Sequence, residues 1–325
     1  MKIDIHAHIV TRDYNEELAK VMRLEIDTNT PGRTFMRRQG ATYAWYREDM
    51  FDIDHRLTVM DKMGIDIRVL SLSAPSVYVW DAPSQVKVAR RINDDVAKIC
   101  KAHPDRFVGL ATLPLKDVDT SLKELDRCLD DLDFKGVAIG SNIDGVQMND
   151  PKLEPIWARI NRDKLMVFEH PMFPHDADSA VMREFELPLR LGFVNDTTLA
   201  ATRMIYGGIF ERYPDIPYVM SHTGGTLLTV LERLDNGYRL FPDCRKYINK
   251  LPSEYAKKLY YDSCSFFEPA LMMAHKIVGP DHILLGTDDP FIQTDAKHVD
   301  TLPVSEPDKK RMLGGNAARL LGLKL

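Results

Sequence analysis

The chain has 325 residues, of which 44% are hydrophobic and 28% are charged, and this composition excludes a disordered protein. Its formal net charge is −5 and its Lys and Arg residues are scattered, so a nucleic-acid partner is not expected. The sequence contains no run of about 18 apolar residues, which excludes an ordinary transmembrane helix and gives no reason to expect a membrane partner.

The four cysteines lie far apart and form no C-x-x-C motif: Cys100, Cys128, Cys244 and Cys264. This spacing predicts neither a disulfide framework nor a zinc finger. The apolar residues of the opening MKIDIHAH are interrupted by Asp and His, unlike those of an export signal. We therefore expect a protein of the reducing cytoplasm.

Eight short runs rich in Val, Ile, Leu and aromatic residues recur along the chain, and most are apolar on both faces, as in the strands of a buried parallel sheet. They are residues 2–8, 66–72, 106–112, 135–140, 165–170, 217–222, 258–263 and 282–287. Helical periodicity separates them, most clearly over 84–103 and 119–132. Eight alternations of strand and helix predict an α/β fold, a single (β/α)8 barrel domain over residues 1–325. An open dinucleotide-binding sheet is disfavoured, because no G-x-G-x-x-G follows the first run.

Residues 10–52 interrupt the regular spacing, between the first predicted strand and a helix that starts near Asp54. The segment contains turn residues, a group of aromatics between Tyr43 and Tyr46, and Arg47. At the end of a barrel strand, such an insertion is where a lid or substrate wall would lie. A purely structural flap would have the same composition, and both interpretations stay open.

Five chemically active side chains stand at the ends of predicted strands. His6 and His8 end the first strand, His170 the fifth and His222 the sixth, and Asp288 follows the eighth. The carboxyl ends of barrel strands meet at one mouth, so these side chains are expected to share a pocket. The other histidines are expected to be ordinary structural residues: His55, His103, His175, His275, His282 and His298.

His6 and His8 are two residues apart, and side chains at i and i+2 of a strand point the same way, so both imidazoles can bind one ion. A third histidine and a carboxylate would complete the ligand set. Such ligands suit Zn²⁺, and by the same chemistry Mn²⁺, Fe²⁺, Co²⁺ or Ni²⁺. Spacing alone does not decide which histidine binds metal and which transfers protons.

Gly224 and Gly225 follow His222 and are expected to open a helix. The free N–H groups of a helix start attract anions, so a substrate carboxylate could bind there. A tight turn from strand to helix would need the same glycines, and the sequence favours neither explanation.

Four motifs together carry a family resemblance: I-D-I-H-A-H at 3–8, F-E-H-P at 168–171, S-H-T-G-G at 221–225 and G-T-D-x-P-F at 286–291. With them the chain resembles the metal-dependent decarboxylase branch of the amidohydrolase superfamily. The similarity runs nearly end to end and includes residues 105–114, 205–214 and 315–323.

The resemblance implies a distorted barrel that holds one divalent ion, usually zinc, between His6, His8, His170 and Asp288. It implies that His222 lies beside the ion as the proton-transfer group, so that His222 and Asp288 are the catalytic residues. It also implies that the guanidinium of Arg47, in W-Y-R-E-D, binds a substrate carboxylate. A homodimer is implied as well.

Three features depart from the family pattern. Where a relative supplies a second carboxylate-binding Arg across a dimer interface, this chain has Phe241, with Arg239 two residues earlier. Tryptophans expected near the substrate are replaced by Glu186 and Leu189, and the aromatic residue after the metal-binding Asp is replaced by Asp289. The metal-binding residues match and the pocket differs, so the resemblance does not identify the substrate.

The implied reaction is the nonoxidative decarboxylation of an aromatic, hydroxybenzoate-like or muconate-like carboxylic acid. The alternative is a hydrolase or hydratase that attacks a lactone, amide or unsaturated acid with hydroxide formed at the same ion. Two-metal hydrolases of the superfamily usually carry a bridging Lys after the fourth strand, and GVAIGSN has none, which favours one ion and decarboxylation. A barrel that had lost its chemistry would be expected to lack one of the five groups, and all five are present.

Overall fold

The computed structural model describes residues 1–174, 177 and 179–324. Its parallel strands lie where the sequence predicts them. The parallel strands are β1 (Ile3–Ile9), β5 (Ile67–Leu72), β6 (Phe107–Gly109) and β7 (Ala111–Thr112), β8 (Gly136–Gly140), β11 (Met166–His170), β12 (Tyr218–Met220), β13 (Tyr260–Asp262) and β14 (Ile283–Leu284). β6 and β7 are two halves of one predicted strand, interrupted at Leu110.

These strands follow one another around a barrel. One sheet has the order β1-β5-β6 and the other the order β14-β13-β12-β11-β8-β7. The sheets join at two seams: the Leu110 N–H donates to the Leu70 carbonyl, and the Ile5 and His8 N–H groups donate to the Leu285 and Asp289 carbonyls. The α/β barrel class is therefore confirmed, and its distortion lies at these seams.

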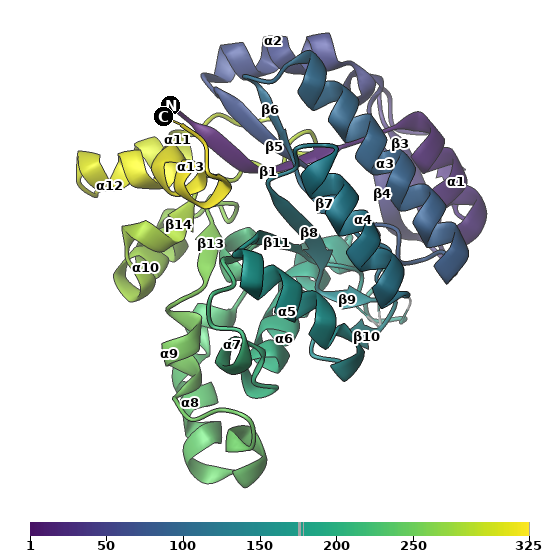
Figure 1. The fold of residues 1–325 in the computed structure, drawn as a ribbon. Coiled ribbons are helices and arrows are strands. Elements are labelled where there is room, and N and C mark those ends of the chain that lie inside the picture. Colours follow the sequence, from purple (N-terminus) through teal and green to yellow (C-terminus); the bar gives the residue numbers. More distant parts are fainter. Residues whose placement is uncertain (175–176, 178, 325) are drawn as a thin grey trace.

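Helices surround the strands, as Figure 1 shows. The longer ones are α2 (Ile53–Met63), α3 (Ala82–Ala102), α4 (Val118–Asp130), α5 (Glu154–Asp163), α6 (Phe193–Tyr206), α8 (Leu231–Leu240) and α10 (Glu268–Val278). Shorter ones are α7 (Ile209–Arg212), α9 (Pro252–Ala256), α11 (Lys297–Asp300), α12 (Glu306–Lys310) and α13 (Asn316–Leu321). Asp81 and Asp117 accept hydrogen bonds from the first-turn N–H groups of α3 and α4, which explains where these two predicted helices begin.

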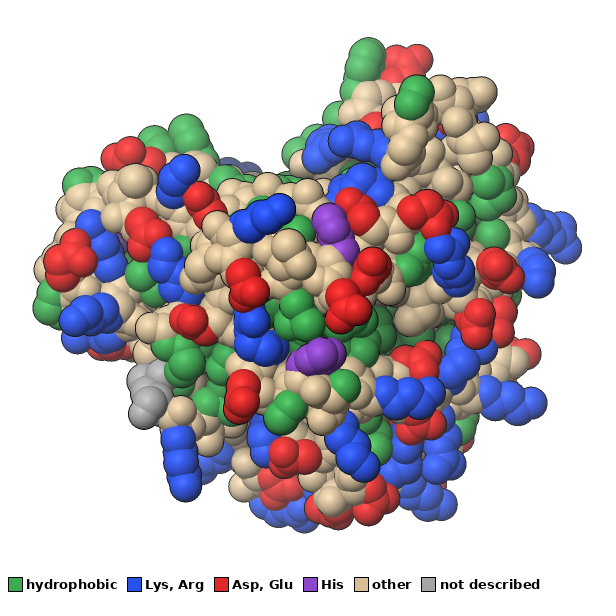
Figure 2. Space-filling model, turned by 90° about the horizontal axis from the view of Figure 1, so that it is seen from above, with side chains coloured by type: hydrophobic (Ala, Val, Ile, Leu, Met, Phe, Trp, Pro, Cys, Tyr) green, Lys and Arg blue, Asp and Glu red, His purple; other side chains and the backbone are tan. Residues whose placement is uncertain are grey.

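The inner and outer faces of the strands carry separate cores. Inside the barrel, Ile3 and Ile5 pack with Phe168 and with α13 residues such as Leu321. Val167, on the opposite face of β11, belongs to the larger core between strands and helices. Charged side chains of both signs are interspersed on the face seen in Figure 2, in keeping with the modest net charge.

The insertion over residues 10–52 is folded. It contains α1 (Arg12–Met22) and the antiparallel sheet β2 (Glu25–Asp27), β3 (Thr34–Arg38) and β4 (Ala41–Tyr46). Met36 and Tyr43 are buried in the outer core, so the sheet is packed onto the barrel. A small hairpin of β9 (Asn142–Ile143) and β10 (Val146–Gln147) follows β8.

The region after β12 differs from the expectation. β12 ends at Met220, and His222 lies in a short 3₁₀ turn, His222–Gly224, with positive φ at His222 and Thr223. The prediction that Gly224 and Gly225 open a helix is wrong, because α8 begins only at Leu231. A Cβ at Gly225 would lie 2.3 Å from the Val194 carbonyl oxygen, so close packing as well as positive φ requires these glycines.

No helix in the described part of the chain is both long enough and apolar enough to cross a bilayer.

Candidate metal centre

Four predicted ligands converge at the mouth of the barrel. One ligand atom from each of His6, His8, His170 and Asp288 lies within 4.8 Å of every other. The Nε2 atoms of His6 and His8 lie 3.4 and 3.3 Å from Asp288 Oδ1. His6 and His8 are fully buried, and they come from the first strand while Asp288 follows the last.

A β-bulge in β1 gives His6 and His8 their direction. The pairing with β5 shifts between Asp4 and Ala7, so β1 carries one extra residue there. Ile3 and Ile5 point into the barrel, and strict alternation would send His6 and His8 to the opposite face. The bulge returns both rings to the inside, a known use of bulges next to functional sites.

Each of the three rings has its Nδ1 atom held by a partner. The His6 Nδ1–H donates to Asp262 Oδ2 (2.6 Å), and His8 Nδ1 lies 3.2 Å from the Ser71 hydroxyl. His170 Nδ1–H donates to the next carbonyl of the chain at 2.9 Å. These contacts fix the tautomer in which Nε2 carries a free lone pair, as outer-shell partners of metal-binding histidines do.

The free nitrogens fit an ion. Nε2 of His6 and Nε2 of His8 are buried and have no hydrogen-bond partner among the described residues, although buried polar atoms are normally paired. Burial, together with the neighbouring His8, lowers the pKa of His170 well below its ordinary value, so that this ring is neutral and able to act as a ligand. Burial opposes ionisation of Asp288, but its contacts with His6 and His8 hold the pKa of the carboxyl well below its usual range. Three imidazoles that each can offer Nε2, together with a carboxylate, suit a divalent transition metal.

His222 lies beside this cluster. Its ring centroid is 5.0 Å from that of His6 and 5.8 Å from that of His170. Burial lowers its pKa to about 4, with the His6 charge as the second cause. The structure therefore brings all five predicted groups together, although His222 comes from a turn and not from a strand.

Arg47 lies at the edge of the site and is already partly engaged. Its Nε donates to Asp49 Oδ1 (3.0 Å), and its NH2 donates to the Pro290 carbonyl (3.2 Å), two residues beyond Asp288. The insertion thus reaches the loop that carries Asp288. One edge of the Arg47 guanidinium is already bound to Asp49.

Aromatic contacts also connect the insertion to the four predicted ligands. The ring centroids of Trp45 and Phe291 are 5.6 Å apart, and those of Phe291 and His8 are 5.7 Å apart. Glu186 accepts hydrogen bonds from Arg37 (2.8 Å) and Thr42 (3.0 Å), so it holds the segment after β11 against β3 and β4.

The remaining pocket departures lie elsewhere. Leu189 lies in a π-helical turn, Pro188–Gly192, just before α6. Arg239 donates to Glu232 and Asn236 of its own helix, α8, which projects at the bottom of the view in Figure 1. Phe241 is 60% exposed at the end of that helix.

Asp289 is buried in a charge network beneath the site. Its carboxylate accepts from Arg56 NH2 and lies 2.8 Å from Arg68 NH1. Arg56 also donates to the His8 carbonyl (2.9 Å), and Arg68 lies 3.4 Å from Asp4. The charge that replaces an aromatic residue here is thus compensated by two buried guanidinium groups.

Two residues near the ion site were missed from the sequence. Asp262 binds His6, and Cys264 belongs with His6, His222 and Asp288 to a second group whose ligand atoms lie within 4.8 Å of one another. Asp262 lies at the end of the seventh predicted strand and Cys264 directly follows it, so the rule applied to the other strand ends would have found them.

Most of the other histidines have structural partners. His282 contacts the Leu259 carbonyl, His298 the Ser263 hydroxyl, and His275 the Asp308 carboxylate. His55 lies 3.6 Å from Asp49, and the ring of His103 contacts Phe107. His175 is outside the described residues.

Comparison with known proteins places this geometry in a family. The profile of the amidohydrolase family matches residues 3–323. The chain is 31% identical over 332 residues to a 2-amino-3-carboxymuconate-6-semialdehyde decarboxylase of Dictyostelium discoideum, covering 99% of this chain and 92% of that protein. It is also 31% identical over 294 residues to a gamma-resorcylate decarboxylase of Rhizobium radiobacter, covering 83% and 87% of the two chains.

A solved structure agrees with this. The crystal structure of a dihydroxybenzoic acid decarboxylase from Polaromonas sp., with bound manganese and the inhibitor 2-nitroresorcinol, has a TM-score of 0.85 to this chain at 26% identity. The match covers 99% of this chain and 96% of that one.

Proposed function

The chain belongs to the amidohydrolase family, in which it is a metal-dependent, nonoxidative decarboxylase of an aromatic or muconate-like carboxylic acid, and we propose that its reaction takes place at the cluster of His6, His8, His170 and Asp288. The observation that supports this most directly is the set of three imidazoles with Nδ1 held, two of which place Nε2 within 3.4 Å of the Asp288 carboxylate. Such a set is the arrangement of a metal centre and has no other evident use in a barrel core.

The four side chains hold one divalent ion, and Zn²⁺ is our proposal for its identity. When bound, the ion supplies a Lewis acid for the substrate carboxylate and a neighbouring oxygen. His222 lies on one side of the cluster and relays a proton from solvent to the carbon that loses CO₂, so that the carbon–carbon bond breaks and a carbon–hydrogen bond replaces it. Protonation interrupts the conjugation of the substrate, and the loss of CO₂ restores it.

Arg47 and the insertion orient the acid and exclude water. The guanidinium of Arg47 donates to the Pro290 carbonyl, two residues beyond Asp288, and its remaining N–H groups can bind a carboxylate or phenolate oxygen. Residues 10–52 act as a cap, and the contact of Trp45 with Phe291 supports this role.

We propose a cytoplasmic homodimer as the working form. The exposed apolar side chains near the end of α8, Leu240 and Phe241, are 69% and 60% exposed and support an interface there. Sedimentation of the purified protein measures the mass of the species in solution, and a monomer at micromolar concentration would contradict the dimer.

The reaction class is tested by measuring CO₂ release from the metal-loaded protein with a panel of hydroxybenzoic, hydroxyisophthalic and muconic acids. Lactones and amides are assayed alongside for hydrolysis. We expect CO₂ from at least one acid. Turnover of lactones alone would overturn the decarboxylase assignment in favour of hydroxide chemistry at the same ion.

A further inference from the structure

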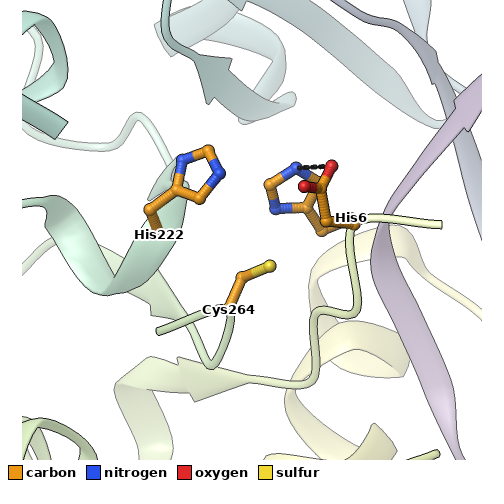
Figure 3. A group of neighbouring side chains, drawn as sticks. His6, His222 and Cys264 are labelled. Carbon is orange, nitrogen blue, oxygen red and sulfur yellow. Dashed lines mark ion pairs between the residues drawn. The ribbon is translucent and has the colours of Figure 1, made fainter. Parts of the chain in front are cut away.

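Cys264 stands next to the proposed ion site and has no part in the proposed reaction. Its thiol, together with His6, His222 and Asp288, forms a group whose ligand atoms all lie within 4.8 Å of one another. Figure 3 shows the His222 ring, the His6 ring and the Cys264 thiol around one space. The group shares His6 and Asp288 with the first ion site and adds a soft sulfur ligand.

Hydrogen bonds hold this group together. Asp262 Oδ2 accepts from His6, and Asp262 Oδ1 accepts from the backbone N–H groups of Thr223 (2.8 Å) and Cys264 (2.9 Å). The Ser265 N–H donates to the Thr223 hydroxyl (3.2 Å). The turn that carries His222 and the loop that carries Cys264 are therefore fixed to each other and to β1.

Of the two shared side chains, only Asp288 can bind both ions. His6 Nε2 has one lone pair, which the first ion would use, so His6 cannot hold a second ion. Asp288 has two oxygens, and Oδ1 is the one that faces His6 and His8. Its Oδ2 is then available to a second ion, as in two-metal sites with a bridging carboxylate. The His222 ring contributes one nitrogen to the group, and Figure 3 shows a ring nitrogen turned toward His6.

We propose that His222, Cys264 and the second oxygen of Asp288 form a separate, inhibitory site for a thiophilic divalent cation such as Cd²⁺ or excess Zn²⁺. A thiolate selects these ions over Mn²⁺ or Mg²⁺. Binding releases the thiol proton of Cys264 to solvent and occupies the His222 nitrogen. The enzyme is then inhibited through its proton donor while the first ion stays in place. This inference rests on the proposed function for the ligand that the two sites share and for the role of His222.

The test compares the wild type with Cys264→Ser, and with Cys264→Ala in case the serine variant does not fold. Cys128→Ser is the matched control, because Cys128 is also a buried free thiol but lies in α4. Cadmium bound per chain is measured by equilibrium dialysis, and cadmium–thiolate bonding by its ultraviolet charge-transfer absorption.

We expect two cadmium ions per chain in the wild type and in Cys128→Ser, with thiolate absorption, and one ion without that absorption in both Cys264 variants. In the Mn²⁺-loaded enzyme, Cd²⁺ should inhibit the Cys264 variants at least about 10-fold more weakly, since a lost direct ligand costs no less than a lost supporting group.

One ion in every variant, or one ion in the wild type with thiolate absorption, would overturn the second site. The latter result would mean that Cys264 replaces a histidine around a single ion. Failure of the proposed function gives a different result, namely no CO₂ release by the Mn²⁺-loaded wild type and no metal in the Cys264 variants.

Discussion

The orientation of the His6 imidazole depends on a single carboxylate. Asp262 is fully buried, and its two oxygens bind the His6 ring, the Thr223 N–H and the Cys264 N–H. It therefore fixes the tautomer of one predicted ligand and the turn that carries His222. A negative charge behind the imidazole also makes Nε2 a better donor to a metal.

Replacing Asp262 with Asn should lower metal affinity by about 10–100-fold, the usual cost of losing an outer-shell partner. Titration of the metal-free protein with Mn²⁺ against a competing chelator gives the affinity. Asp235→Asn is the control, because this buried aspartate binds Ser253 instead of a histidine. An unchanged affinity in Asp262→Asn would show that the ring needs no such support.

His222 should be required for turnover but not for the ion. We expect His222→Asn to lower the rate by about 10²–10⁴-fold, the typical contribution of a general acid, while bound metal stays near the wild-type level. His275→Asn is the control, since His275 pairs with Asp308 outside the site. Loss of metal together with rate would make His222 a ligand.

Glu169 makes stability depend on pH. Burial, followed by the charge of Asp196, raises its pKa from 4.5 to about 8. The folded protein then binds one more proton than the unfolded chain between pH 4.5 and 8. Glu169 should therefore contribute its full stabilisation below pH 4.5. The free energy of unfolding should fall by up to ~1.4 kcal/mol per pH unit as the pH rises from 4.5 to 8.

Glu169→Gln should remove that dependence, because an amide mimics the protonated acid and can still accept from the Thr197 hydroxyl. Urea unfolding from pH 5 to 8 should show the variant gaining stability relative to the wild type as the pH rises. Parallel curves for the two proteins would contradict the raised pKa.

The barrel strands and the insertion differ in how far the sequence predicts them. Strands such as β8 and β11 are buried on both faces, and a continuous apolar run shows this directly. β3 is half-exposed and carries Arg37 and Arg38, whose guanidinium groups lie over Phe35 and Tyr43, so its pattern is that of a polar loop. The position of the insertion could be predicted, and its internal sheet could not.

The same contrast holds within the site. His6, His8, His170 and Asp288 stand out because such residues are rare at the ends of buried strands. The partners of Asp289 could not be predicted, because Arg56 and Arg68 lie more than 200 positions away and only the fold makes them neighbours. The turn at His222 was also missed, since positive φ at a non-glycine residue leaves no mark in the sequence.

The insertion should loosen when its contact with Glu186 is lost. Glu186→Ala removes the partner of Arg37 and Thr42, and amide hydrogen exchange should become faster in β3 and β4 but not in β8. The control is Glu17→Ala, which breaks the pair with Arg91. Equal exchange in β3 and β4 of the wild type and Glu186→Ala would show that core packing alone holds the sheet.

At the scale of the whole molecule, the buried charges around Asp289 stabilise the seam where the first barrel strand meets the segment after the last one. Asp289 pairs through its carbonyl with β1 and through its carboxylate with Arg56 and Arg68. Asp289→Ala would remove the carboxylate partner of Arg56 and leave Arg68 with Asp4 alone. We expect a loss of roughly 3–5 kcal/mol in the free energy of unfolding, as for other broken buried pairs.

Urea denaturation of the metal-free protein measures this loss without a contribution from the ion. Glu232→Ala is the matched control, because it breaks the exposed pair with Arg239 and should cost less than about 1 kcal/mol. Equal losses in the two variants would mean that the buried network does not brace the seam.

The seam also sets the order of events during synthesis. β1 is made before the segment around Leu285 and Asp289, and it finds one of its two neighbours only when that segment has been made. His6 and His8 are therefore made long before the carboxylate that completes their proposed set. We expect a chain that stops before Asp288 to leave the barrel open at this seam and to bind the ion more weakly than the full chain does.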